Sequence, residues 1–136
     1  MKYKTLTVTA DDVLNGKPNS QTCCAIALAV DRQECMNREG KYEPGRSPWQ
    51  PEINCSDEMY IEDKSNEDEY IALEVHPDDK DFVDDFIQAY DSWCKHVGGV
   101  ILEDIGTISF QYKTYIWNRH KDGRVGSWRE DNMEVK

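Results

Sequence analysis

The fold is decided first by residues 76–91, which read HPDDKDFVDDFIQAYD. Pro77 and the carboxylates after it are typical of the first turn of a helix, where proline needs no N–H partner and negative charge meets the positive end of the helix dipole. Apolar residues then recur at helical spacing, with carboxylates between them. We therefore expect a helix over about 77–97 with one core face and one acidic face. The expected core positions are Phe82, Val83, Phe86, Ile87, Tyr90, Cys94 and Val97.

The wider stretch 57–91 holds nearly all of the surplus charge of the 136-residue chain. It contains 14 carboxylates against two lysines, a net charge of −12, whereas the whole chain carries −11. Such a local negative field attracts proteins with a basic surface and speeds their association. We therefore predict that the acidic face of the helix binds a basic partner protein. The predicted partner-binding residues are Asp78, Asp79, Asp81, Asp84, Asp85 and Asp91.

A second helix is predicted over about 21–34. Its central segment, CCAIALAV, is apolar on every side, and a helix with no polar face is usually buried in the core. Ser20 or Thr22 is the expected N-cap. The adjacent Cys23 and Cys24 would point about 100° apart on a helix and have no electropositive neighbours. We therefore interpret them as structural residues and not as a reactive pair.

Alternating polar and apolar residues predict the strands of a sheet. Residues 4–9 form the first expected strand, and Thr9 or Asp11 is placed to cap a short helical turn after it. A polar loop between 59–61 and 70–75 predicts a hairpin. Further strands are expected over 100–102 and 107–113.

These elements predict one α+β domain over residues 1–136, with a small, mainly antiparallel sheet packed against two helices at about 21–34 and 77–97. Repeated glycine and proline break every period in the segment 37–57, which predicts a long loop. Residues 115–136 form a basic, aromatic C-terminal extension.

The aromatic and basic residues of the loop and the extension define an alternative site. An Asp-Gly pair at 122–123 predicts a hairpin that joins 115–120 to 124–129. In a homo-oligomer, tryptophan and arginine side chains from these segments could enclose a small anionic, nucleotide-like ligand. Direct binding of nucleic acid is not expected, because a chain of charge −11 repels phosphate. The alternative ligand-binding residues are Trp49, Trp117, Arg119, Arg124, Trp128 and Arg129.

Several other classes of protein are not expected. The five cysteines are odd in number and form no CxxC pair, which favours free thiols, and their spacing to histidine matches no zinc site. The carboxylates at 78–85 could hold Mg²⁺ or Ca²⁺, but a solvated helix face is the commoner meaning of that pattern. Without GxSxG, HExxH or a glycine-rich phosphate loop, we expect no enzyme, cofactor or metal. No apolar run approaches the roughly 20 residues of a membrane span, so we expect a cytoplasmic protein without membrane contact.

Residues 8–16, VTADDVLNG, and 23–29, CCAIALA, resemble a group of short phage and prophage proteins of unknown function. Those proteins carry a similar strand, an acidic dipeptide, a glycine and a Cys-Pro-Ile-Ala-Leu-Ala helix, and residues 82–91 look like their second helix. The resemblance covers roughly half of the chain. Here Ala25 replaces the proline, and the 37–55 loop and the basic extension have no counterpart.

The resemblance implies a phage origin and an α+β domain, and it carries over no catalytic residue. Combined with the acidic helix face, it predicts a phage-encoded inhibitor that acts in the cytoplasm of the host cell. Its target would be a host nucleic-acid-binding or defence protein, bound through mimicry of nucleic acid.

Overall fold

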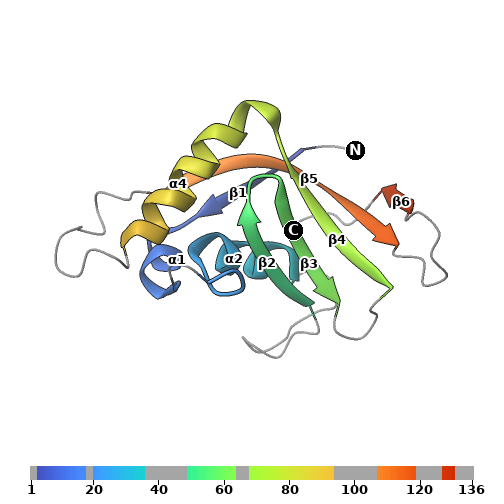
Figure 1. Cartoon of the computed structure of the whole chain (residues 1–136), viewed down its shortest axis with the longest axis horizontal. Helices are drawn as coiled ribbons and strands as arrows, with labels where there is room; N and C mark the ends of the chain where they lie inside the picture. The colour runs from blue at the N-terminus through green and yellow to red at the C-terminus, as the bar shows by residue number, and fades with distance from the viewer. Residues whose placement is uncertain are drawn as a thin grey trace.

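A six-stranded antiparallel sheet forms the centre of the protein in the computed structural model shown in Figure 1. Its order is β1-β5-β4-β3-β2, and β6 pairs with β5 on the same edge as β1. The strands are β1 (Lys4–Val8), β2 (Trp49–Cys55), β3 (Glu58–Asp63), β4 (Glu69–Val75), β5 (Ile108–Asn118) and β6 (Ser127–Glu130). The helices are α1 (Ala10–Asn15), α2 (Ala25–Val30), the π-helix η1 (Asp31–Cys35), the 3-10 helix η2 (Pro77–Asp79) and α4 (Lys80–Trp93). The structure describes residues 3–17, 20–35, 49–63, 68–93, 107–118 and 127–130.

The sheet has two different faces, as the alternation in the sequence predicts. On β4, Ile71, Leu73 and Val75 are buried, whereas Glu74 is exposed. We call the buried side the inner face and the other side the outer face. Because α2 contacts both β1 and β2, which lie at opposite edges, the sheet curls around this helix (Figure 1). The predicted α+β fold with an antiparallel sheet is confirmed.

The core lies between the inner face and the helices. As predicted, α2 is deeply buried, with Ala25, Ala27 and Ala29 at 0% exposure. Helix α4 contributes three buried residues on one stripe, Val83, Phe86 and Tyr90. Phe82 was expected in the core as well, and this prediction is wrong. Its side chain is 38% exposed because it lies on the flank of the buried stripe, in the first turn of α4.

The helix predicted over 21–34 begins later than expected. Cys24 keeps an extended backbone (φ −69°, ψ 171°) and is the N-cap, so α2 starts at Ala25. The Cys24 sulfur accepts a hydrogen bond of 3.5 Å from the backbone N–H of the third helical residue. Neither of the predicted caps, Ser20 and Thr22, has this role. The Ser20 hydroxyl instead accepts a hydrogen bond of 3.2 Å from the backbone N–H of Cys23, in the turn before the helix.

The prediction of a long loop at 37–57 is wrong for its second half, because residues 49–55 form β2 and pair with β3. Pro51 is compatible with this strand, since β2 is an edge of the sheet and proline is tolerated where one side of the strand has no ladder partner. Pro51 and Ile53 alternate onto the inner face and are buried. Residues 37–48 of the predicted loop lie outside the described part of the chain.

The other predicted elements are confirmed where the structure describes them. Thr9 caps α1 through a capping box with Asp12. The hairpin of β3 and β4 is formed, and β5 pairs with β6 as expected from the Asp-Gly turn. Among the described residues, no helix is long and apolar enough to cross a membrane. Parts of three predictions, at 94–97, 100–102 and 119–126, fall outside the described residues.

Candidate functional site

The acidic face predicted for the helix divides into three parts in the structure. Asp78, Asp81 and Asp85 are exposed and lie at helical spacing along one side of η2 and α4. We call these three residues the acidic ridge. Within the described part of the chain, no lysine or arginine pairs with Asp81 or Asp85. The ridge therefore presents its negative charge to solvent.

Asp79 and Asp84 instead attach the helix to the sheet. A carboxylate oxygen of Asp79 accepts a hydrogen bond of 2.8 Å from the backbone N–H of Gln111 on β5. Asp84 accepts two hydrogen bonds from Ser56, which lies in the β2–β3 turn and is 1% exposed. These two aspartates hold the helix, and with it the acidic ridge, in a fixed position on the domain.

The β2–β3 turn adds one exposed carboxylate, Asp57, near the start of α4, and the exposed Glu58 follows it as the first residue of β3. Lys80 donates a hydrogen bond of 2.7 Å to Asp57. This bond, together with the negative charges of Asp57, Glu74 and Asp84, raises the pKa of Lys80. The positive charge of Lys80 is therefore held by carboxylates of the same chain, and the surface around the ridge stays negative.

Asp91 is separate from the ridge and lines a cavity of about 200 Å³ between the start of α2, β2 and α4. Burial raises the pKa of Cys24 and of Tyr90, two other residues of this cavity, so both side chains are protonated at neutral pH. The Tyr90 hydroxyl donates a hydrogen bond of 3.1 Å to the carbonyl of Val13. Neither group is an activated nucleophile, because a reactive thiol or phenol needs a lowered pKa. The remaining lining residues are Ser20, Gln21, Ile26, Ile53, Asn54, Phe86 and Ile87.

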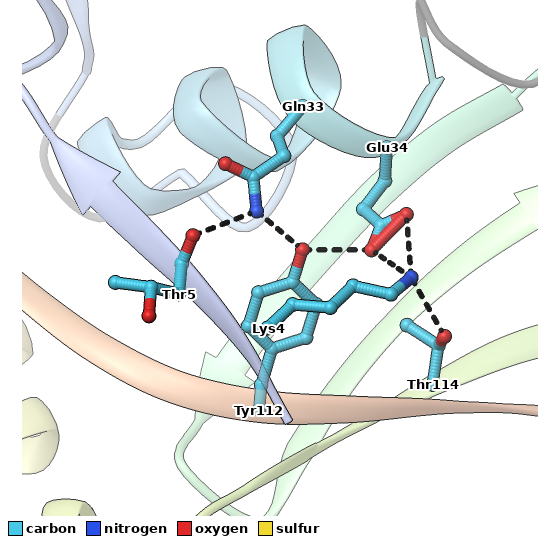
Figure 2. A network of polar contacts seen from close by, with 6 residues as sticks. All are labelled: Lys4, Thr5, Gln33, Glu34, Tyr112 and Thr114. Atoms are coloured by element: carbon cyan, nitrogen blue, oxygen red, sulfur yellow. Dashed lines mark hydrogen bonds and ion pairs between the residues drawn. The ribbon is translucent and has the colours of Figure 1, made fainter. Parts of the chain in front are cut away.

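Figure 2 shows a buried polar network around Glu34 of η1. The Glu34 side chain is 0% exposed, and it accepts hydrogen bonds from the Tyr112 hydroxyl at 2.7 Å and from the Lys4 ammonium at 2.9 Å. Lys4 also donates to the hydroxyl of Thr114 at 3.1 Å, and the side-chain amide of Gln33 donates to Tyr112 at 2.6 Å. The cavity beside Asp91 does not reach these groups. We assign the network a structural role, because its polar atoms satisfy one another and tie η1 to the sheet.

Of the residues of the alternative ligand site that the structure describes, only Trp117 and Trp128 lie side by side. Trp49 lies on the inner face of β2 and packs against the core. Trp117 lies on the outer face of β5, directly opposite Trp128 of β6, which is 59% exposed. Arg129 binds the carboxylate of Glu69 through two nitrogens, at 2.9 and 3.3 Å. Outside the described residues lie Arg119 and Arg124.

A group of aromatic side chains on the outer face was not recognised from the sequence. Ring centroids are 5.6 Å apart for Tyr60 and Tyr70, 6.5 Å for Tyr70 and Trp117, and 5.3 Å for Tyr115 and Trp128. We call these five residues the outer aromatic band. Each alternates along its strand with residues that face inward, so the pattern marks the face, but only strand pairing brings the rings together.

No protein-family model, curated protein or solved structure matches this chain. Among the described residues, no group of three or more histidine, cysteine, aspartate or glutamate side chains is arranged to hold a metal ion. The geometry therefore offers two surfaces, the acidic ridge and the outer aromatic band. Both have the chemistry of binding: fixed negative charge attracts a basic surface, and aromatic rings that are half-buried, or exposed as in Trp128, supply contact area.

Proposed function

We propose that this chain is a phage-encoded acidic protein that acts in the host cytoplasm by binding a host nucleic-acid-binding or defence protein. The acidic ridge occupies the basic surface on which that partner binds nucleic acid, and the partner is thereby inhibited. The phage origin is supported by the resemblance of residues 8–16 and 23–29 to short phage proteins. The binding mode is supported by the charge and geometry of the ridge.

One observation carries the proposal. Asp78, Asp81 and Asp85 are exposed on one side of η2 and α4. These helices are fixed to the sheet by the hydrogen bonds that Asp79 and Asp84 accept. A row of negative charges on a rigid support loses little conformational entropy when it binds, unlike the same charges on a flexible segment. Complementary charge also speeds association and selects basic partners.

The test is capture of proteins from a bacterial lysate by the immobilised chain at low and high salt. The variant carries Asp81→Asn and Asp85→Asn, which remove two ridge charges. A matched control carries Asp11→Asn and Leu14→Lys, two exposed positions on α1, and changes the net charge by the same amount. Helix α1 contacts the C-terminal half of α4 through Val13 and Tyr90, away from the ridge.

We expect the wild-type chain and the control to capture a basic protein that double-stranded DNA or high salt releases. The ridge variant should capture about tenfold less of it, because close complementary charges contribute strongly to such interfaces. Equal capture by the ridge variant and the wild type would refute the proposal. Capture that DNA does not compete with would refute the mimicry of nucleic acid.

A further inference from the structure

The outer aromatic band lies among carboxylates. Glu52 is directly opposite Tyr60 in the register of β2 and β3, and Glu74 lies on the same face of β4 as Ala72, which is directly opposite Tyr115 of β5. Burial raises the pKa of both tyrosines, and the neighbouring glutamates raise each pKa further. Within the described residues, the helices contribute their buried side chains to the core on the inner face. The glutamates that share the outer face are Glu52, Glu58, Glu62 and Glu74.

The same face already holds one cation against an aromatic ring. The ammonium nitrogen of Lys113 lies 4.5 Å from the centroid of the Tyr3 ring. Lys113 is also directly opposite Glu74 in the register of β4 and β5. A cation on this face is therefore attracted both by a ring and by a carboxylate, and these attractions add.

This combination favours a basic protein segment over nucleic acid. Surfaces that bind single-stranded nucleic acid combine aromatic rings with lysine and arginine, whereas here the rings stand beside glutamates that repel phosphate. A guanidinium group suits the face better than an ammonium group does. It is planar, stacks on aromatic rings and binds a carboxylate through two parallel N–H groups.

We infer that the outer face of the sheet binds an arginine-rich segment of a partner protein, whose guanidinium groups stack on the outer aromatic band and pair with the surrounding glutamates. The inference rests on the proposed function, because it gives the basic partner a second point of contact besides the acidic ridge. It also makes a prediction that the ridge does not make. The ridge needs only positive charge, whereas the band distinguishes arginine from lysine.

The test compares three fluorescently labelled probes by titration with the intact chain: an oligo-arginine peptide, an oligo-lysine peptide of the same length, and oligouridine. The variant is Trp128→Ala, and the matched control is Leu14→Ala, because both side chains are 59% exposed. Glu52→Gln is a second variant that keeps the shape of its side chain. Circular dichroism checks that each protein is folded.

We expect oligo-arginine to bind about five- to tenfold more tightly than oligo-lysine, and oligouridine to bind more weakly than both. Trp128→Ala should remove most of the preference for arginine, Glu52→Gln should weaken the binding of oligo-arginine, and Leu14→Ala should change neither. If Trp128→Ala does not fold, the result for Glu52→Gln decides. Equal binding of the two peptides, an unchanged preference in folded Trp128→Ala, unchanged binding of oligo-arginine by Glu52→Gln, or tighter binding of oligouridine would each overturn the inference.

Failure of this inference and failure of the proposed function give different results. If the Asp81 and Asp85 variant loses its captured partner while the wild type shows no preference for arginine, the proposed function stands and the outer face is not a binding site. If the preference for arginine is present but the ridge variant captures its partner normally, the outer face is a binding site and the ridge is not.

Discussion

Asp84 accepts two hydrogen bonds from Ser56, one from the backbone N–H and one from the hydroxyl, each 2.8 Å long. The two residues are 28 positions apart in the chain, and Ser56 is almost completely buried. The contact joins the β2–β3 turn to α4. One carboxylate of the acidic helix face is therefore part of the architecture, and its removal should affect folding before it affects binding.

We predict that Asp84→Ala lowers the free energy of unfolding by about 1–3 kcal/mol, because two buried donors of Ser56 lose their acceptor. Urea denaturation followed by circular dichroism measures this change. Asp85→Ala is the control, since Asp85 is exposed on the next helical position, and it should change stability by less than about 0.5 kcal/mol. Equal stabilities of the two variants would show that the Ser56 contact does not hold the turn.

The network around Glu34 should be sensitive to the removal of single members. We predict that Glu34→Ala costs about 3–5 kcal/mol, because it leaves the Lys4 ammonium and the Tyr112 hydroxyl without their buried acceptor. Replacing Lys4 and Glu34 together with methionine should cost less than Glu34→Ala alone, since no charge is then left unpaired. Urea midpoints of the single and double variants test this order. A double variant less stable than Glu34→Ala would contradict it.

Gly16 has no room for a side chain. A Cβ atom built there would meet the Tyr90 hydroxyl, and it would lie 2.8 Å from the backbone nitrogen of Ala25 and from the carbonyl oxygen of Asp12. The backbone of Gly16, with φ −73°, is open to any residue, so the constraint is space alone. We predict that Gly16→Ala lowers the thermal midpoint and costs about 1–3 kcal/mol. Asn15→Ala, at an exposed neighbouring position, should be close to neutral, and equal midpoints for the two variants would refute the prediction.

Stability should fall in alkali. The pKa values of Cys24 and Tyr90 are raised above their ordinary values of 9.0 and 10.0, chiefly by burial. Their contribution to stability is therefore complete below those values and is lost as the pH rises through them, because the unfolded chain releases these protons first. We expect a lower urea midpoint near pH 10.5 than near pH 8 in the presence of a reductant.

Tyr90→Phe is the control for this pH dependence. It removes the ionising hydroxyl, together with the hydrogen bond to Val13, so it should lower stability at both pH values but reduce the difference between them. A midpoint in the wild type that does not change between the two pH values would contradict the assignment of Tyr90 and Cys24 as protonated core groups.

For helix α4, the spacing of apolar residues predicts which side chains are buried but not which aspartates are exposed. Its apolar positions recur at helical spacing, and the buried stripe of Val83, Phe86 and Tyr90 follows from that spacing alone. The six aspartates predicted to bind a partner, two on η2 and four on α4, look equivalent in the sequence because all lie away from the stripe. In the structure they differ in their neighbours. Ser56 donates hydrogen bonds to Asp84, the backbone N–H of Gln111 donates one to Asp79, and Asp91 lines the cavity.

Strand β2 shows a second limit. Pro51 and the nearby prolines disfavour both a helix and a central strand, so the sequence predicts a loop here. Whether a strand with proline is tolerated depends on its place in the sheet. That place was not visible in the sequence, because the order of the strands is set by the pairing of β2 with β3 at the open edge.

The α+β class, the buried helix α2, the two faces of the strands and the concentration of negative charge in residues 57–91 could all be predicted from the sequence. These properties follow from periodicity, which records the burial of each residue relative to its near neighbours. Three features could be seen only in the folded chain: which aspartates stay exposed, the pairing of Glu34 with Lys4 across 30 residues, and the five aromatic rings that share the outer face. Those outcomes depend on strand order and register, because hydrogen bonds and ring contacts act over a few ångströms between segments far apart in the chain.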